Sequence, residues 1–433
     1  MTRTVDARAD ATPVERVFRE AYGQAVATLT RIFGDITLAE DAVQDAFVVA
    51  SDRWRRDGIP PNPAGWIVTT ARNRAIDDLR RSARGRELVE QLGPLAHTPH
   101  VLNPEERGED GAVTDDRLRL IFTCCHPALR PEHRVALTLR LLGGLGVDEV
   151  ARSFLVSEPA MAKRLGRAKY KIKAARIPYR VPDEADLPSR LGSVLSVLYL
   201  IYNTGADDPE RASLRGEGIW LARALVELMP DEPEAAGLLA LMLLNESRMP
   251  ARTDEGALVL LRDQDRTKWD QALIEEGQAI VHACIRRGRP GPYQLQAAIQ
   301  AVHCNAESFE ATDWPQIVAL YDHLFSILPT PVVALNRVIA VAEVEGPGAA
   351  LEALDAIGPD LDGYHLLHAT RGTLLRRLGR REDARAAFER AARLAATEAD
   401  RQFLAEQIEV LAEDEAQIAP SGSTGSTNET GTL

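Results

Sequence analysis

Apolar residues recur at intervals of three and four along most of this chain, the spacing expected of helices that bury one side. The clearest case is residues 157–176, where the predicted helix has one apolar stripe of Met161, Leu165, Ala168 and Ile172. Ser157 suits the N-cap and Pro159 is tolerated in a first turn. The rest of the helix is basic, with seven Lys and Arg residues against one acid, Glu158. The pattern predicts a helix that packs on one side and meets a polyanion on the other.

Two predicted helices precede this basic helix. Residues 131–142 are apolar at helical spacing and end at Gly143-Gly144, and residues 147–154 form a short helix with acids in its first turn. A tight turn at 155–157 then leads into the basic helix, which is the arrangement of a DNA-reading helix-turn-helix. A solvated basic face on an ordinary helical hairpin is the alternative interpretation.

Two more helices are predicted near the N-terminus. An amphipathic helix at 14–33 ends at Gly34, and a capping box of Thr37 and Glu40 should open a helix that runs to about residue 56. The apolar side of that second helix consists of Ala42, Val43, Ala46, Phe47, Ala50 and Trp54. Its polar side consists of Glu40, Asp41, Gln44 and Asp45.

A third N-terminal helix is predicted at 66–84, after a proline-containing loop at 57–65. The positions spaced for burial are Ile67, Ala71, Ala75 and Leu79. The polar stripe is Asn73, Asp77, Arg80 and Arg84, flanked by Arg72, Arg74 and Arg81. Such a stripe, with Trp66 at its start, suits phosphate contact and base stacking, and a plain solvent-exposed face is the alternative.

The C-terminal half is also helical in pattern, from residue 187 to 412. Ala350 and Leu354 match Ala384 and Phe388 at an offset of 34 residues, the period of tetratricopeptide repeats. We therefore expect a tetratricopeptide-like solenoid, which would present a concave surface to a protein or peptide. The apolar run 195–203 is either a seam against the DNA-binding part or the first core helix of the solenoid. The tail 420–433 lacks apolar anchors and is expected to be disordered.

Charge is divided unevenly along the 433 residues. Residues 1–180 hold 29 Lys and Arg against 24 Asp and Glu, a net of +5, whereas 181–433 hold 22 against 40, a net of −18. The N-terminal part can therefore bind nucleic acid, while the acidic remainder should repel it. We find neither an apolar run long enough to span a membrane nor a secretory signal in the sequence. We therefore expect a cytoplasmic protein without membrane contact.

Candidate sites for metal or redox chemistry are few. The adjacent Cys124, Cys125 and His126 lack the ligand spacing of a zinc site, which favours core packing. A second group, which helical pairing could bring together, consists of His282, Cys284, His303 and Cys304. The four cysteines contain no CxxC pair, and we recognise no phosphate-binding loop, HExxH motif or nucleophile and base pair. We therefore expect no cofactor, no metal and no enzymatic activity.

Two of these segments together resemble a known family. Residues 37–84 resemble region 2, and residues 117–176 resemble region 4, of sigma-70-type factors of the extracytoplasmic-function (ECF) group. They occur in the expected order, and the polar segment 85–116 is similar to the linker between the two regions. The resemblance implies an all-α protein with region 2 at 12–84 and region 4 at 117–180. The whole chain resembles the ECF factors whose C-terminal extension stands in for a separate anti-sigma protein, which implies regulation in cis by residues 187–412.

The resemblance also implies core RNA polymerase and promoter DNA as partners, together with a protein partner of the solenoid. The polar side of the second helix (Glu40, Asp41, Gln44 and Asp45) would dock on polymerase by pairing with arginines. The residues that the resemblance places at the −10 element are Trp66, Asn73, Arg74, Asp77, Arg80 and Arg81. Those placed at the −35 element are Ser157, Lys163, Arg164, Arg167 and Lys171.

Three functions are consistent with the residues. The first is a promoter-recognition subunit that requires core polymerase. The second is a stand-alone helix-turn-helix regulator with a protein-binding solenoid, which would have no need of the 37–84 segment. The third is an enzyme whose site lies in the C-terminal half, for which we find no supporting constellation. The resemblance favours the first.

Overall fold

The computed structural model describes residues 13–81, 116–154, 156–206, 212–254, 257–395 and 397–418. The predicted tail at 420–433, and the predicted linker at 85–116 except its last residue, lie outside these ranges. The chain forms two compact units, Met1–Met242 and Leu243–Leu433. The prediction of an all-α fold is confirmed, since the strands found in the described ranges are only β1 (Thr253–Asp254) and β2 (Ala257–Leu258), paired antiparallel.

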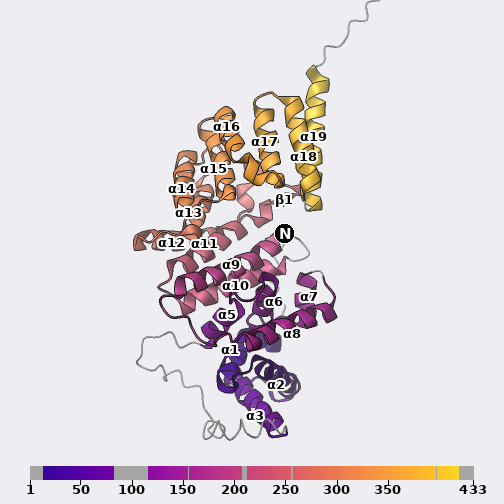
Figure 1. Cartoon of the computed structure of the whole chain (residues 1–433), viewed down its shortest axis with the longest axis vertical. Helices are drawn as coiled ribbons and strands as arrows, with labels where there is room; N and C mark the ends of the chain where they lie inside the picture. Colours follow the sequence, from indigo (N-terminus) through magenta and orange to yellow (C-terminus); the bar gives the residue numbers. More distant parts are fainter. Residues whose placement is uncertain are drawn as a thin grey trace, which may run out of the picture. The chain divides into compact units, whose positions relative to one another are not determined.

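The first unit is built of helices (Figure 1). Its first three pack together, and Figure 1 draws them in indigo to purple. The later helices of this unit continue from region 4 into the C-terminal extension. The bounds are α1 (Pro13–Phe33), α2 (Ile36–Asp57), α3 (Pro63–Arg81), α5 (Asp116–Cys124), α6 (Pro131–Leu141), α7 (Val147–Ser153), α8 (Glu158–Ala174), α9 (Leu187–Ala206), α10 (Ser213–Leu228) and α11 (Pro233–Glu246), the last of which crosses into the second unit.

The apolar side predicted for α2 is confirmed, because Ala42, Val43, Ala46, Phe47, Ala50 and Trp54 are all buried. The predicted capping box is wrong. Asp35 is the N-cap, and its carboxylate accepts hydrogen bonds from the backbone N–H of Thr37 and Leu38. An Asp at this position satisfies the free amides of the first turn better than Thr37 could from inside the helix. In α3, which begins at Pro63, three residues before the predicted start, Ile67, Ala71 and Ala75 are buried.

Region 4 follows the predicted pattern closely. Helix α7 and the basic helix α8 pack together, and α8 also packs on α6. The apolar stripe predicted for α8 is confirmed, since Met161, Leu165, Ala168 and Ile172 are buried. Ser157 holds the N-cap position, but its hydroxyl makes no capping hydrogen bond.

Helix α9 carries the apolar run whose role the sequence left open. It packs on α10 and also on α5 and α6 of region 4, so it both joins the following helices and covers the DNA-binding part. Arg190 anchors its first turns, because its guanidinium donates a 2.6 Å hydrogen bond to the carbonyl oxygen of Phe122 and lies over the Phe122 ring. Region 4 and the start of the extension therefore share one core.

The second unit is a succession of helices that pack mainly on their neighbours in the chain. The matched positions of the 34-residue repeat, Ala350, Leu354, Ala384 and Phe388, are all buried. Short 3-10 turns lie at η3 (Met249–Ala251), η4 (Leu261–Asp263), η5 (Arg266–Lys268) and η6 (Gly358–Leu361). The helices are α12 (Gln271–Arg287), α13 (Pro292–Asn305), α14 (Trp314–Ile327), α15 (Pro331–Val344), α16 (Pro347–Ile357), α17 (His365–Arg377), α18 (Arg381–Leu394) and α19 (Glu398–Ile418).

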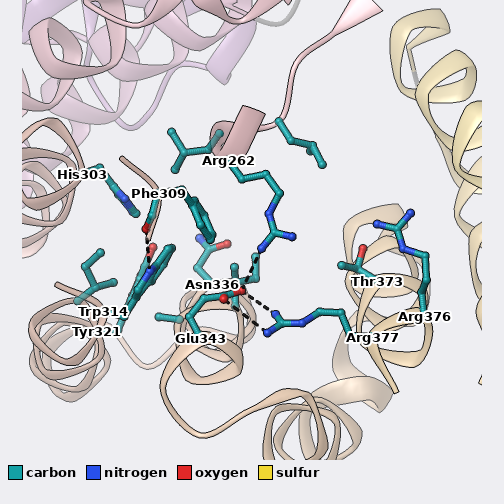
Figure 2. Close-up of a pocket in the computed structure, with 15 residues that line it drawn as sticks. Arg262, His303, Phe309, Trp314, Tyr321, Asn336, Glu343, Thr373, Arg376 and Arg377 are labelled. Atoms are coloured by element: carbon teal, nitrogen blue, oxygen red, sulfur yellow. Dashed lines mark hydrogen bonds and ion pairs between the residues drawn. The ribbon is translucent and has the colours of Figure 1, made fainter. Parts of the chain in front are cut away.

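A cavity of about 260 Å³ opens in this unit beside η4, lined by residues of α14, α15 and α17 (Figure 2). Glu343 lines the cavity and pairs with Arg377 at 2.6 Å and with Arg262 at 3.8 Å. Arg262 also lies over the ring of Phe309, 4.7 Å from its centre. Arg262 and Arg377 thus share one carboxylate, and with Arg376 the charged groups that line the cavity carry a net positive charge.

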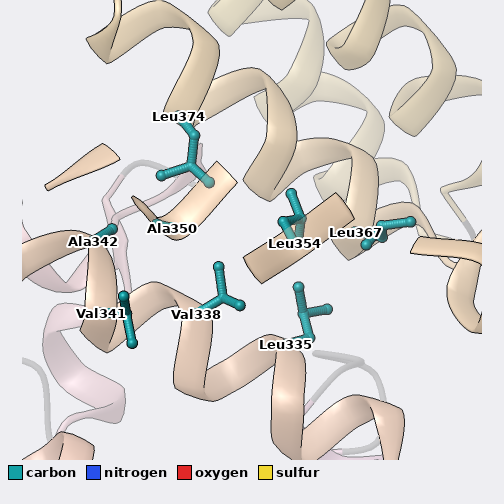
Figure 3. Close-up of a cluster of buried hydrophobic side chains, with 8 residues drawn as sticks. All are labelled: Leu335, Val338, Val341, Ala342, Ala350, Leu354, Leu367 and Leu374. Carbon is teal, nitrogen blue, oxygen red and sulfur yellow. The ribbon is translucent and has the colours of Figure 1, made fainter. Parts of the chain in front are cut away.

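The core of the second unit includes one cluster in which α16 lies between α15 and α17 (Figure 3). Ala350 and Leu354 of α16 are fully buried there, against Leu335 and Val338 of α15 and Leu367 of α17. Where α17 crosses α18, a Cβ on Gly372 would lie 2.7 Å from the Phe388 ring. Glycine is therefore required at that position for close packing.

Candidate polymerase and nucleic-acid interface

The polar side of α2 carries the carboxylates expected to meet polymerase. Asp41 and Asp45 are exposed, and Gln44 is half-buried. Asp45 pairs at 3.4 Å with Arg74 of α3, a residue that the sequence placed at the −10 element. Burial raises the pKa of Asp41; Lys169 opposes this shift, whereas Glu40 and Asp45 add to it. The surroundings of Asp41 thus disfavour the charged form of its carboxylate. A cation brought close to Asp41 would stabilise that charged form.

Glu40 differs from its neighbours because region 4 covers it. Its side chain is only 4% exposed, and its two oxygens lie 2.7 Å from Nε of Arg140 and 2.6 Å from Nζ of Lys169. Gln44 donates a further hydrogen bond to the same carboxylate. Arg140 is itself 6% exposed and also donates to the carbonyl oxygen of Leu145. A buried charge requires such partners, and this carboxylate has two cationic ones.

The stripe expected at the −10 element lies along α3. Trp66 is half-buried, with its ring centre 5.4 Å from that of Trp54 in an edge-on contact. Asn73, Asp77 and Arg80 are exposed, and Asp77 lies 3.9 Å from Arg80 one turn along the helix. Arg81 ends the helix, and its side chain lies outside the described part of the chain. The structure therefore aligns three of the predicted residues on one exposed face.

The residues expected at the −35 element lie on the surface of α8 opposite its buried stripe. Ser157, Lys163, Arg167 and Lys171 are exposed. Arg164 is half-buried, with its guanidinium 5.1 Å from the ring centre of Phe154. Ser157 is exposed at the N-cap of α8 and its hydroxyl makes no capping bond, while Pro159 in the first turn supplies no N–H.

Sequence reasoning missed the residues that join the two regions. Lys169 and Lys173 belong to the basic helix but reach back to Glu40 and Asp35 of α2. Arg140 is the one charged residue in the mainly apolar segment 135–142, and a single charge inside such a segment is the signal that could have marked it as a buried ion-pair partner. Tyr170 of α8, which is 74% exposed, is a further aromatic side chain on the basic surface.

The candidate cysteines and His303 lie in packed surroundings, whereas His282 is exposed. Cys124 and Cys125 are buried in region 4, and burial raises the pKa of the Cys125 thiol to about 11. In the second unit His303 packs against Trp314, and burial, with Arg248 and Arg266 nearby, lowers its pKa to about 3. Within the described ranges, no three His, Cys, Asp or Glu side chains gather as they would around a metal ion.

Comparison with known families matches the two regions found here. Residues 17–85 match the family described as sigma-70 region 2, and residues 119–172 match sigma-70, region 4. Residues 190–285 match a family of unknown function, which covers α9 to most of α12. The matched segments thus coincide with α1–α3, with α5–α8 and with the start of the extension.

Three relatives extend the comparison. An uncharacterized protein of Rhizobium meliloti is 44% identical over 407 residues, which cover 92% of this chain and 96% of that protein. The ECF RNA polymerase sigma factor SigL of Mycobacterium tuberculosis is 31% identical over 166 residues, 37% of this chain and 88% of SigL. The probable ECF RNA polymerase sigma factor SigI of the same species is 27% identical over 168 residues, 38% of this chain and 56% of SigI.

A region 2 bundle followed by a region 4 helix-turn-helix defines a sigma-70-type factor. The chain belongs to the ECF RNA polymerase sigma factors and carries a C-terminal helical extension. Sigma factors are not enzymes, and this family implies core RNA polymerase and promoter DNA as partners. No helix in the described ranges is long and apolar enough to cross a membrane.

Proposed function

We propose that this factor docks on core polymerase through α2, opens the −10 element with α3 and contacts the −35 element with α8. The observation that carries the proposal is the division of α8 into a buried apolar stripe and an exposed basic face. A helix so divided is held firmly by its own domain and still offers four exposed polar side chains to DNA.

The electrostatics of α2 support its assignment to polymerase. Asp41 and Asp45 stand one turn apart on an exposed face, and the pKa of Asp41 is raised by burial and by its acidic neighbours. A partner that brings arginines to this face would relieve that repulsion and gain charge-assisted hydrogen bonds. Such complementarity sets both the register and the rate of association.

The experiment is initiation in vitro from a promoter library, with purified core polymerase and the full-length chain. Asp41→Arg with Asp45→Arg should abolish core binding and initiation while circular dichroism shows unchanged helicity. Asp183→Arg with Glu184→Arg is the matched control, because it makes the same charge change at exposed positions after α8. Unaltered core affinity in the Asp41 and Asp45 variant would refute the docking assignment.

We further propose that the extension after region 4 regulates the factor in cis. The support is that α9 packs on α5 and α6, so the extension begins within the core of region 4. A chain that ends after α11, at Glu246, tests this proposal while keeping α9 in place. Higher initiation by the shortened chain indicates inhibition by the second unit, lower initiation indicates activation, and unchanged initiation refutes the proposal.

A further inference from the structure

The cavity beside η4 has an aromatic side and a cationic side (Figure 2). The aromatic side, at the left of Figure 2, includes Phe309, Trp314 and Tyr321. The cationic side, at the right, includes Arg376 and Arg377 of α17. A cavity with one apolar and one charged side favours a ligand that is divided in the same way.

The charged residues that line the cavity are three arginines and one acid, which leaves a net charge of +2. His303 also lines it, but burial, with Arg248 and Arg266 nearby, lowers the pKa of its ring to about 3. That ring is therefore neutral near pH 7 and leaves the balance unchanged. In a chain whose net charge is −13, the cavity is a local excess of positive charge that attracts anions.

Arg262 is placed to donate hydrogen bonds to a ligand. Its guanidinium lies over the ring of Phe309, and its nearest carboxylate oxygen, on Glu343, is 3.8 Å away. That distance is too long for a hydrogen bond, and the described part of the chain offers the Arg262 side chain no other acceptor. The side chain is 44% exposed, so a ligand oxygen can replace the water around its N–H groups.

The two arginines of α17 differ in how far their charge is balanced. Arg377 donates to both oxygens of Glu343, at 2.6 and 3.5 Å, and to the carbonyl oxygen of Ala342 at 3.1 Å. Arg376 donates to the amide oxygen of Gln407 at 2.7 Å, which is a neutral partner. Within the ranges that the structure describes, Arg376 meets no carboxylate. Its positive charge is therefore available to an anionic ligand.

The aromatic side is held in place by its own contacts. The ring centre of Trp314 lies 4.9 Å from that of Phe309 and 5.3 Å from that of His303. The indole N–H of Trp314 also donates to the carbonyl oxygen of Phe309 at 3.3 Å. Because these rings are fixed before a ligand arrives, binding costs little further ordering. An apolar group of the ligand gains free energy by burial against them.

We propose that this cavity binds a small organic acid, with its carboxylate towards the arginines and its apolar body towards Trp314 and Tyr321. The volume of about 260 Å³ is slightly below the usual range of about 300–1,000 Å³ for ligand pockets, which favours a small free molecule. The site is a property of the second unit additional to the proposed regulation in cis. It does not depend on the docking roles proposed for α2 and α8.

The first test compares three acids with their neutral amides by isothermal titration calorimetry on the full-length chain. The acids are benzoate, phenylacetate and indole-3-acetate, and the amides are benzamide, phenylacetamide and indole-3-acetamide. We expect at least one acid to bind about tenfold or more tightly than its amide, because hydrogen bonds between arginine and a carboxylate are the stronger kind. A smaller difference in all three pairs, or no binding by any acid, overturns the proposal.

The second test adds a negative charge at the cavity without disturbing the core. Ile339 lines the cavity and is 45% exposed, so Ile339→Glu and its neutral match Ile339→Gln should both fold. Acid binding should be about tenfold weaker or more in Ile339→Glu than in Ile339→Gln, while amide binding stays the same, because repulsion acts only on the charged ligand. Ile285→Glu is the control, since Ile285 is 65% exposed on α12 and lies outside the cavity.

A third variant removes a positive charge. Arg376→Gln keeps a donor for Gln407 and should weaken acid binding about fivefold or more, whereas Arg286→Gln, at an exposed position of α12, should not. Circular dichroism checks that each variant is folded, and if Ile339→Glu is not, Arg376→Gln decides alone. Acid binding that is unchanged in a folded Ile339→Glu or in Arg376→Gln overturns the proposal, because the acid then binds elsewhere.

Discussion

The buried carboxylate of Glu40 offers the sharpest quantitative prediction. Glu40→Gln preserves the shape of the side chain and removes its charge. One amide oxygen can still accept from Arg140 or from Lys169, but the amide NH₂ group then faces the other cation, donor against donor. The variant therefore leaves a buried cation without a carboxylate partner.

The expected loss follows from burial on both sides of the pair. Glu40 and Arg140 are 4% and 6% exposed, so solvent screens their interaction little. Breaking a buried ion pair by removing one partner costs about 3–5 kcal/mol. The retained hydrogen bond places Glu40→Gln at the lower end, about 3 kcal/mol, or about a hundredfold in the equilibrium for separating α2 from α6 and α8.

Hydrogen exchange measured by mass spectrometry reads this equilibrium helix by helix. Protection of amides in α6 and α8 should fall about a hundredfold in Glu40→Gln. Helices α17 and α18 of the second unit serve as the reference within the same sample and should not change. Glu184→Gln, at an exposed position after α8, is the control for loss of a negative charge.

A second substitution tests the physical reason itself. Lys169→Met on the Glu40→Gln background removes the cation that faces the amide, so part of the lost protection should return. Neighbours in one ion-pair network are expected to be non-additive in this way. A change of less than about threefold in Glu40→Gln would refute the reasoning, and so would full additivity of the two substitutions.

Two further predictions concern the second unit. Gly372→Ala would place a methyl group 2.7 Å from the Phe388 ring and should destabilise this unit by about 1–3 kcal/mol in urea unfolding, whereas Gly348→Ala, with open space around it, should not. His303 has a pKa of about 3 when folded and an ordinary value of 6.5, so the unfolded chain binds its proton first. Stability of the unit should therefore fall as the pH drops from 6.5 towards 3, and His303→Gln should flatten that dependence. A steeper pH dependence in the variant would contradict the assignment.

Sequence periodicity was enough to locate the helices of both sigma regions. Each predicted apolar position of α8 is buried, because a helix in a small domain must cover the stripe that its own spacing creates. The cap of α2 was misassigned to Thr37, since Asp35 and Thr37 are both capping residues and only the backbone path decides between them. The 34-residue match between α16 and α18 likewise predicted which of their residues are buried.

The sequence by itself thus determined the helices, the order of the two sigma regions and the candidate faces for polymerase and DNA. Only the tertiary structure decided which charges of those faces meet one another. Lys169 and Lys173 look no different from Lys171 in the sequence, yet they pair with Glu40 and Asp35 across more than a hundred residues. Helical spacing is a local property of the chain, while a pairing between distant charges depends on how whole helices pack.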